Sequence, residues 1–410
     1  MLVKLEKYLD IKRGPGLPSK FYSDAGSLIR LTLGNFNYPT GGFKENDSKK
    51  NIYYTGIVKD EYILKKGDLI TPLTEQAEGL LGTTAWVPEN NKYIQNGDIG
   101  LVLPFKDKLD SKFCYYLLSS TLIKKQLSSA AQQTKIRHTS PGKIKACLAP
   151  IPTIDIQKRI GTLLSSIDDQ IEENNIMVKR LQVLAQAIYT RWFLQFEFPN
   201  EEGKPYKSSG GKMVWNDELK RELPEGWEVK NIKELCDITW GQCPDSGNIL
   251  PLDTKENDAI KYCSGAGDMR NGLLVDCQAK TNESKRYADK GDVLMSVAGS
   301  IGALAIVDEQ ISLGRAAMAF TPKKCTKLFA YLAIKSLVER IKQVASGSIQ
   351  KVINDNHIND MNIPYNEIVF KMFEEYNGII EEQIALSKES QKLISLRNYL
   401  LPLLINGQLQ

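Results

Sequence analysis

The chain has 410 residues, of which 42% are hydrophobic and 25% are charged, as is usual for a soluble globular protein. Single hydrophobic cores rarely grow beyond about 300 residues, so this length predicts at least two domains. No apolar run is long enough to cross a membrane and the first ten residues are too charged for a secretory signal, so we expect a cytoplasmic protein.

Cysteine spacing and charge balance narrow the class further. The seven cysteines show no Cys-x-x-Cys spacing, which favours reduced thiols over a disulfide framework or a zinc site. Residues 1–150 carry 22 Lys and Arg against 14 Asp and Glu, whereas residues 223–365 carry 17 against 18. The basic first part is compatible with a polyanionic partner or with an ordinary solvated surface.

The opening of the chain occurs a second time in its middle. LVKLEKYLDIKRG at the N-terminus aligns with LPEGWEVKNIKELCDITWG, with Leu5 on Ile232 and Gly14 on Gly241. Further matches keep the same order, which predicts two copies of one unit, each a compact domain followed by a helix, with two-fold pseudo-symmetry. The matched segments are Asp10-Ile11 with Asp237-Ile238, 66–70 with 290–294, Phe113 and Tyr115 with Phe329 and Tyr331, 132–136 with 348–352, Ile151-Pro152 with Ile363-Pro364, and Gln170-Ile171 with Gln383-Ile384.

The globular parts have irregular, strand-like patterns with a few helices. KGDVLMSVAGSIGALAIV (290–307) predicts a strand, a tight turn and a second strand, and residues 110–128 and 326–345 predict helices. The expected fold class is therefore α+β, with two similar mixed α/β domains.

A long helix follows the first domain. Apolar residues recur there with alternating steps of four and three, which is the seam of a helix that packs along another helix. We expect Asp155 to cap its start and Pro199 to end it, and Asn174 on the seam either pairs with a polar group or faces water. The seam residues are Ile160, Leu164, Ile167, Ile171, Asn174, Val178, Leu181, Ala185, Ile188 and Trp192.

The C-terminal segment predicts a second long helix that packs against the first. Ile379, Leu386, Leu393 and Leu400 recur every seven residues, and we expect Pro402 to kink or end the helix near Leu401. The predicted domains are 1–152 and 223–365, the long helices are 153–198 and 366–410, and 199–222 is a linker.

Signals for catalysis are few. Only two histidines are present, and no phosphate-binding glycine loop of the GxxxxGK[ST] or GxGxxG kind occurs. Pro244-Asp245 followed by Asp253-Thr254-Lys255 has the spacing of a PD-(D/E)xK nuclease, but the first copy has nothing equivalent. Two functions therefore stay open as alternatives to the one that the resemblance below implies. They are a stand-alone nuclease and a coiled-coil adaptor that binds no DNA.

The motifs together resemble one known family. LPEGWEV with the following Asp237-Ile238 and Gly241, GDVLMSVAGSIGALAIV, SGSIQKVIN, and IDDQIEENNIMVKRLQVLAQAIYTRWF closing in FEFP are similar to the specificity subunit of type I restriction–modification enzymes. The first copy departs from this pattern, because it lacks the GSIG turn and the LPEGW lead.

This resemblance implies a non-catalytic protein with two target-recognition domains, each reading one half of a split sequence in double-stranded DNA. It also implies that the two helices set the spacing and dock two methyltransferase subunits, with restriction–translocase subunits added outside. S-adenosylmethionine, ATP and Mg²⁺ are then expected on those partners, and no cofactor or metal on this chain.

The candidate DNA contacts are polar and basic side chains in loops, because Arg, Lys, Asn and Gln read base edges and hold phosphates. Each of these side chains is also compatible with an ordinary solvated surface, and Arg315 is also compatible with a buried, paired position. Trp192 and Phe193 are the candidates for partner binding. The DNA candidates are Lys12, Arg13, Lys20, Tyr38, Lys44, Thr134, Lys135 and Arg137 in the first copy, and Gln242, Ser246, Arg270, Lys285, Arg286, Arg315, Ser348, Gln350 and Lys351 in the second.

Overall fold

The computed structural model divides the chain into two compact units. Unit 1 is Met1–Ile171 together with Gln391–Gln410, and unit 2 is Glu172–Ser390. Each unit therefore combines a globular part with one segment of each long helix. The structure describes residues 2–38, 41–45, 51–75, 79–130, 137–256, 258–269, 272–344 and 353–408.

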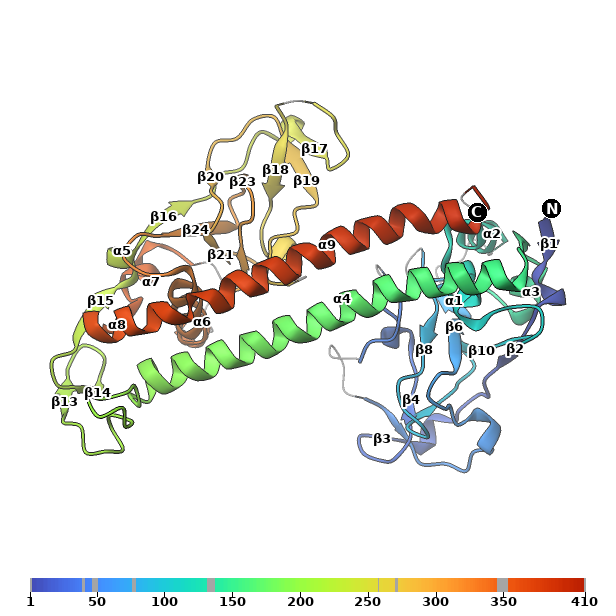
Figure 1. Cartoon of the computed structure of the whole chain (residues 1–410), viewed down its shortest axis with the longest axis horizontal. Helices are drawn as coiled ribbons and strands as arrows, with labels where there is room; N and C mark the ends of the chain where they lie inside the picture. Colours follow the sequence, from blue (N-terminus) through green and yellow to red (C-terminus); the bar gives the residue numbers. More distant parts are fainter. Residues whose placement is uncertain are drawn as a thin grey trace. The chain divides into compact units, whose positions relative to one another are not determined.

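Unit 1 is built on two small sheets (Figure 1). The central sheet has the strand order β2-β10-β6-β8 and is antiparallel, and the second has the order β3-β5-β4-β9 with β4 and β9 parallel. β1 pairs with β12, and β7 with β11. The elements are β1 (Leu2–Lys4), β2 (Leu9–Arg13), β3 (Tyr22–Ser23), β4 (Ile29–Arg30), β5 (Tyr53–Tyr54), β6 (Leu69–Pro72), β7 (Thr74–Glu75), β8 (Ala85–Trp86), β9 (Tyr93–Ile94), β10 (Ile99–Pro104), β11 (Arg137–His138), β12 (Leu148–Pro150), α1 (Ser111–Ser119), α2 (Thr121–Ala130) and α3 (Pro141–Ala146).

Unit 2 repeats this topology. Its central sheet has the order β16-β24-β21-β22, its second sheet has the order β17-β19-β18-β23-β20, and β18 and β23 are parallel like β4 and β9. The predicted duplication of one mixed α/β unit is therefore confirmed. The elements are β13 (Met213–Asn216), β14 (Arg221–Pro224), β15 (Glu228–Asn231), β16 (Cys236–Trp240), β17 (Ile249–Pro251), β18 (Ile260–Cys263), β19 (Ala279–Thr281), β20 (Tyr287–Ala288), β21 (Val293–Ser296), β22 (Leu304–Ile306), β23 (Ile311–Leu313), β24 (Ala317–Pro322), β25 (Asn362–Tyr365), α5 (Ile232–Leu235), α6 (Lys327–Val344), α7 (Asp355–Asn359) and α8 (Glu367–Glu374).

The matching Lys-Gly-Asp segments form the same turn in both units. Gly67 and Gly291 have φ of 86° and 99°, a backbone conformation that favours glycine. The Gly67 N–H donates to the carbonyl of Val87, and the Gly291 N–H donates to that of Val307. The repeated sequence thus marks the start of the equivalent strands β6 and β21.

One predicted match was two residues out of register. Leu2 pairs with Pro150 in unit 1, and its equivalent Val229 pairs with Pro364 in unit 2. The counterpart of Pro364 is therefore Pro150, whereas the sequence alignment had used Pro152. The segment LAPIP contains two prolines at this spacing, and only the strand register distinguishes them.

In each unit a segment of α4 (Ile154–Tyr189) lies beside a segment of α9 (Gly378–Ile405), and the two helices are antiparallel (Figure 1). All ten predicted seam residues, nine in α4 and Trp192 just after it, are buried or half-buried, which confirms the heptad pattern. The Asn174 amide donates to a carboxylate oxygen of Glu389 at 3.0 Å, so the polar seam residue is paired. α4 ends in a short π-helical turn, Thr190–Leu194.

Two details of the helix ends differ from the prediction. α4 begins one residue before Asp155, which therefore lies in the first turn and not at the cap. α9 continues through Pro402 to Ile405. Proline is tolerated there because few residues follow it in the helix and because Ile405 is buried in the core of unit 1.

Each unit has its own hydrophobic core that includes its helix segments. In unit 1, Ile160 and Leu164 of α4 pack with Phe113 of α1 and Leu9 of β2. In unit 2, the core is aromatic and centres on Tyr189, Phe193, Phe329, Phe370 and Phe373. Burial against the globular parts explains why the long helices are stable, because isolated helices gain little from propensity alone.

Candidate nucleic-acid interface

The end of the central sheet of unit 1 gathers most candidates of the first copy. Arg13 at the end of β2 pairs with Gly100 at the start of β10, and Ile99 pairs with Pro72 at the end of β6. We call this region the Arg13 end: the loop after β2, the turn Gln95–Asp98 before β10, and the segment that follows β6. Because neighbouring strands are antiparallel, loops that are distant in sequence meet there.

A glycine allows the loop after β2 to approach the turn before β10. The Gly14 N–H donates to the carbonyl of Ile99, and a Cβ at Gly14 would lie 2.2 Å from the carbonyl oxygen of Asn96. Beside it, Arg13 Nε donates to the carbonyl of Gly97 at 2.7 Å. The Lys12 side chain is exposed, and its carbonyl accepts a hydrogen bond from the buried amide of Gln95.

Three further candidates of unit 1 lie at or beside the Arg13 end. The Gly42 N–H donates to the carbonyl of Thr84, just before β8, which places the loop of Tyr38 and Lys44 there. The side chains of Tyr38 and Lys44 are both exposed to solvent. The Tyr38 hydroxyl donates to the carbonyl of Leu33, and the part of this side chain that is buried raises the pKa of Tyr38. Arg137 is opposite Glu75 in the β7–β11 pair that follows β6.

Unit 2 has the same arrangement at the equivalent place. The Gly241 N–H donates to the carbonyl of Ala317 at the start of β24, and a Cβ at Gly241 would lie 2.1 Å from the carbonyl oxygen of Gly314. We call this region the Arg315 end: the loop after β16, the turn Gly314–Ala316 before β24, and the segment that follows β21. The Gln242 and Arg315 side chains are both exposed there, so Arg315 is not part of a buried ion pair.

An exposed cysteine lies at the Arg315 end. The Cys243 sulfur accepts hydrogen bonds from the backbone N–H of Arg315 and from the Tyr262 hydroxyl. These bonds lower the pKa of Cys243, although burial acts in the opposite direction. The positive charges of Arg315 and Lys285 lower this pKa further. Lys285 Nζ lies 3.0 Å from a carboxylate oxygen of Asp245. Cys243 could not be selected from the sequence, because its neighbours come from a turn, a loop and strand β18, which are far apart in the chain.

Two candidates occupy equivalent 3₁₀ turns before the second sheets. Lys20 lies in Ser19–Phe21, before β3, and Ser246 lies in Ser246–Asn248, before β17. Lys20 Nζ lies 5.0 Å from the centre of the Phe21 ring. Arg286 is exposed just before β20, and its carbonyl accepts a hydrogen bond from the N–H of Leu313.

The remaining candidates fall outside the described residues. Ile353 is the first described residue after the segment that holds Ser348, Gln350 and Lys351. Its N–H donates to the carbonyl of Val297 just after β21. Thr139 makes the equivalent bond to Leu73 just after β6. Thr139 and Ile353 thus lie at the same end of their sheets, beside the segments that follow β6 and β21. The candidates concerned are Thr134, Lys135, Arg270, Ser348, Gln350 and Lys351.

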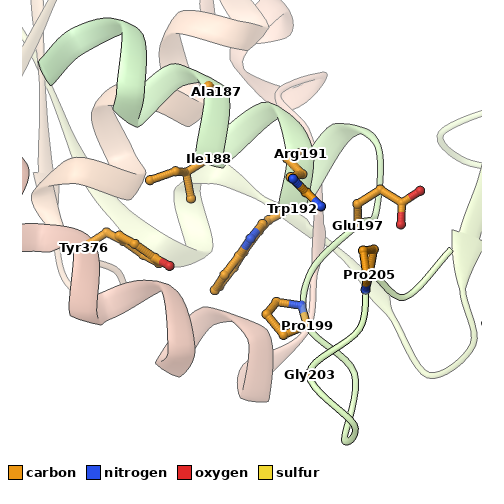
Figure 2. Close-up of a pocket in the computed structure, with 9 residues that line it drawn as sticks. All are labelled: Ala187, Ile188, Arg191, Trp192, Glu197, Pro199, Gly203, Pro205 and Tyr376. Carbon is orange, nitrogen blue, oxygen red and sulfur yellow. The ribbon is translucent and has the colours of Figure 1, made fainter. Parts of the chain in front are cut away.

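The two partner-binding candidates are buried, which corrects the prediction. Phe193 is 1% exposed inside the aromatic core of unit 2. Trp192 is 7% exposed and forms part of the wall of a cavity of about 410 Å³, together with Ile188, Arg191 and Tyr376 (Figure 2). Phe193 packs against Phe329 of α6 and Phe373 of α8, so its ring offers no exposed surface.

The described part of the chain holds no candidate metal site. Among these residues, no group of three or more His, Cys, Asp and Glu could hold a metal ion. In the nuclease-like spacing, Asp253 and Lys255 are both exposed and Asp245 is bonded to Lys285. A search of the described helices for one long and apolar enough to span a membrane found none.

Comparison with known proteins agrees with this geometry. A family model described as the type I restriction modification DNA specificity domain matches residues 27–210 and 224–366. The chain is 24% identical over 330 residues to the specificity subunit of the type I restriction enzyme MjaIX of Methanocaldococcus jannaschii, covering 74% of this chain and 70% of that protein. It is 22% identical over 321 residues to the specificity subunit of the type I restriction enzyme HindI of Haemophilus influenzae, covering 63% and 68%.

A solved structure shows the same fold. The S subunit of a type I restriction–modification system from M. genitalium matches with a TM-score of 0.59 at 18% identity, covering 99% of this chain and 96% of that chain. The family match covers most of the chain and both halves of the duplication. The chain therefore belongs to the DNA specificity subunits of type I restriction–modification enzymes.

Proposed function

We propose that this chain is a non-catalytic DNA reader in which the Arg13 end and the Arg315 end each contact one half of a bipartite target. The observation that carries the proposal is the repeated close approach at Gly14 and Gly241, which builds one exposed polar loop cluster in each unit. Differences between the two clusters would give two different half-sites. In this proposal the reading domains are residues 1–152 and 223–365, joined by the helices 153–198 and 366–410 and the linker 199–222.

An exposed apolar stripe on α4 in unit 2 is the proposed docking surface for a methyltransferase subunit. It consists of Ile176, Met177, Val183 and Leu184, which are between 39% and 70% exposed. Ile176 and Val183 are seven residues apart, as are Met177 and Leu184, so all four share one face of the helix. A helix of the partner would bury this stripe, as exposed apolar patches commonly require.

The catalytic parts belong to the partners in this proposal. Two methyltransferase subunits would carry S-adenosylmethionine, and restriction–translocase subunits would carry ATP and Mg²⁺. This assignment is supported by the match to the specificity-domain family. The chain itself would supply target recognition and spacing.

The test is a genome-wide map of methylated sites in cells that express this chain with its methyltransferase subunit. One bipartite motif with a constant gap supports the proposal, and methylation at an unbroken motif, or at none although the complex assembles, contradicts it. A gel shift with the assembled complex should weaken steeply as salt rises, because phosphate contacts release counterions. No shift at any salt would favour an adaptor, and metal-dependent cleavage by the chain alone would favour a nuclease.

A further inference from the structure

We propose that Arg13 in unit 1 and Arg315 in unit 2 each read a guanine, one in each half of the DNA target. This inference rests on the proposed function and assigns base recognition to one named side chain in each unit. Three observations carry it: the equivalence of the two turns, the free donors of the two guanidinium groups, and the lack of an ion pair at either arginine among the described residues.

The two arginines converge on one turn of the repeated fold. Asn96 and Gly314 are equivalent, because the carbonyl of each faces the glycine of the close approach. The next residues, Gly97 and Arg315, are therefore equivalent too. In unit 1 the guanidinium comes from the end of β2 and bonds to the Gly97 carbonyl, whereas in unit 2 it comes from the turn itself.

The hydrogen bond to Gly97 leaves Arg13 prepared for a base edge. It uses Nε at 2.7 Å, which leaves the two terminal Nη groups to donate in parallel. Guanine presents two acceptors, O6 and N7, in the major groove, and an arginine fork matches them. Gly97 has no side chain to screen this fork, and a Cβ there would come within 4.0 Å of an Nη of Arg13.

Two lysines of the two units are held in ion pairs, whereas the two arginines are not. Lys145 lies 2.8 Å from a carboxylate oxygen of Asp10, where its hydrogen bond lowers the pKa of Asp10, and Lys285 is held by Asp245. Within the described residues, neither Arg13 nor Arg315 forms an ion pair, and both are exposed. The two guanidinium groups, like the exposed Lys12 ammonium, thus remain available to DNA.

The experiment compares methylation maps of the full chain, co-expressed with its methyltransferase subunit, for Arg13→Ala and Arg315→Ala. Each variant should relax one base position in one half-site and leave the other half-site unchanged. The expected loss of discrimination there is on the order of 10- to 100-fold, as for one bidentate contact. Arg13→Lys and Arg315→Lys should relax the same positions, because lysine keeps the charge without the fork.

Matched controls are Lys66→Ala and Lys290→Ala, two exposed lysines of the Lys-Gly-Asp turns at the opposite ends of the same sheets. These should leave both half-sites intact. Full discrimination in the lysine variants, or a uniform loss of methylation over all sequences by a complex that still assembles, would assign the arginines to phosphate and overturn the inference. A wild-type map without two half-sites would overturn the proposed function as well, and is seen before any variant is made.

Discussion

At the residue scale, two glycines shape the loops that we assign to DNA. Gly14 and Gly241 bring one strand end against the carbonyl of the neighbouring turn in each unit. A side chain cannot enter this space, since the obstacle is backbone and not the flexible end of a side chain. The position of the loop, and with it the direction of the adjacent polar groups, therefore depends on glycine.

We expect Gly14→Ala and Gly241→Ala each to weaken methylation and to lower the free energy of unfolding by about 1–3 kcal/mol, the usual cost of overpacking. The added Cβ would lie 2.2 Å or 2.1 Å from a carbonyl oxygen, so the loop must move. Chemical denaturation and methylation assays measure the two effects. Gly16→Ala and Gly247→Ala are the controls, because no atom lies within 4 Å of a Cβ at either position; equal effects in all four variants would contradict this account.

Cys243 offers a native probe of the Arg315 end. Its pKa is lowered chiefly by the backbone N–H of Arg315, and it is the one cysteine of the seven classed as exposed. A lowered pKa means that the reactive thiolate is present at lower pH. We therefore expect Cys243 to be alkylated first by iodoacetamide, at a pH below that needed for an ordinary thiol.

Target DNA should slow this alkylation in the assembled complex. Peptide mass spectrometry with and without DNA measures the protection, and Cys243→Ser identifies the peptide. Alkylation of Cys243 at the same rate in saturating target DNA would show that DNA does not cover the Arg315 end.

At the scale of the elements, the helix pair is held by packing and by a small number of polar contacts. In unit 1, Asp168 of α4 accepts from Arg397 of α9 at 2.7 Å and from the Tyr116 hydroxyl of α1 at 2.5 Å. The Arg397 side chain is only 8% exposed, so its charge depends on this carboxylate. One residue thereby joins both helices to the globular part.

We expect Asp168→Ala to destabilise unit 1 by about 2–3 kcal/mol, somewhat less than the loss of a fully buried pair because Asp168 is partly exposed. Urea unfolding followed by circular dichroism measures the change. Asp169→Ala removes the exposed carboxylate of the next residue and should leave the free energy of unfolding nearly unchanged. If the two variants unfold alike, the network does not hold the helices.

The exposed stripe on α4 should be the surface that binds the methyltransferase subunit. Val183→Glu and Leu184→Glu place a charge in a contact from which water must be excluded. Co-purification with the partner should therefore fall at least tenfold while the fold is retained. Asn175→Glu is the control, because Asn175 is exposed on the same helix but outside the stripe. Undiminished binding by both stripe variants would place the docking surface elsewhere.

The helices show which features can be predicted from the sequence. Their existence and the seam of α4 could be predicted, because ten positions between Ile160 and Trp192 follow the heptad pattern and each proved buried or half-buried. The end of α9 could not, because the effect of Pro402 depends on how the following residues pack. Trp192 and Phe193 were misjudged for a related reason: an aromatic pair in a helix does not reveal whether it faces a core or a partner.

The candidate loops could be located from the sequence, although their contact with DNA stays a prediction. The aligned Gly14 and Gly241 pointed to the loops after β2 and β16, which the structure places at equivalent sheet ends. Arg315 was a candidate, but the equivalence of the turns before β10 and β24 could not be seen, since the equivalent positions hold different residue types, Gly97 and Arg315. Only hydrogen bonds across strands make these two positions equivalent.

At the scale of the whole molecule, the chain is a duplicated body with continuous helices that belong to both units. Divided recognition follows if each unit reads its own bases and the helices fix the distance between them. The unit boundary falls between Ile171 and Glu172 in α4 and between Ser390 and Gln391 in α9. A length change at these two points leaves the contacts within each unit intact.

The most direct measurement of this claim is the methylation map of a chain with one heptad inserted at each of the two boundaries. Seven helical residues add about 10 Å, or roughly three base pairs of DNA. The account predicts the same two half-sites as in the wild type, separated by a gap that is longer by about three base pairs. An unchanged gap between the same half-sites would contradict it.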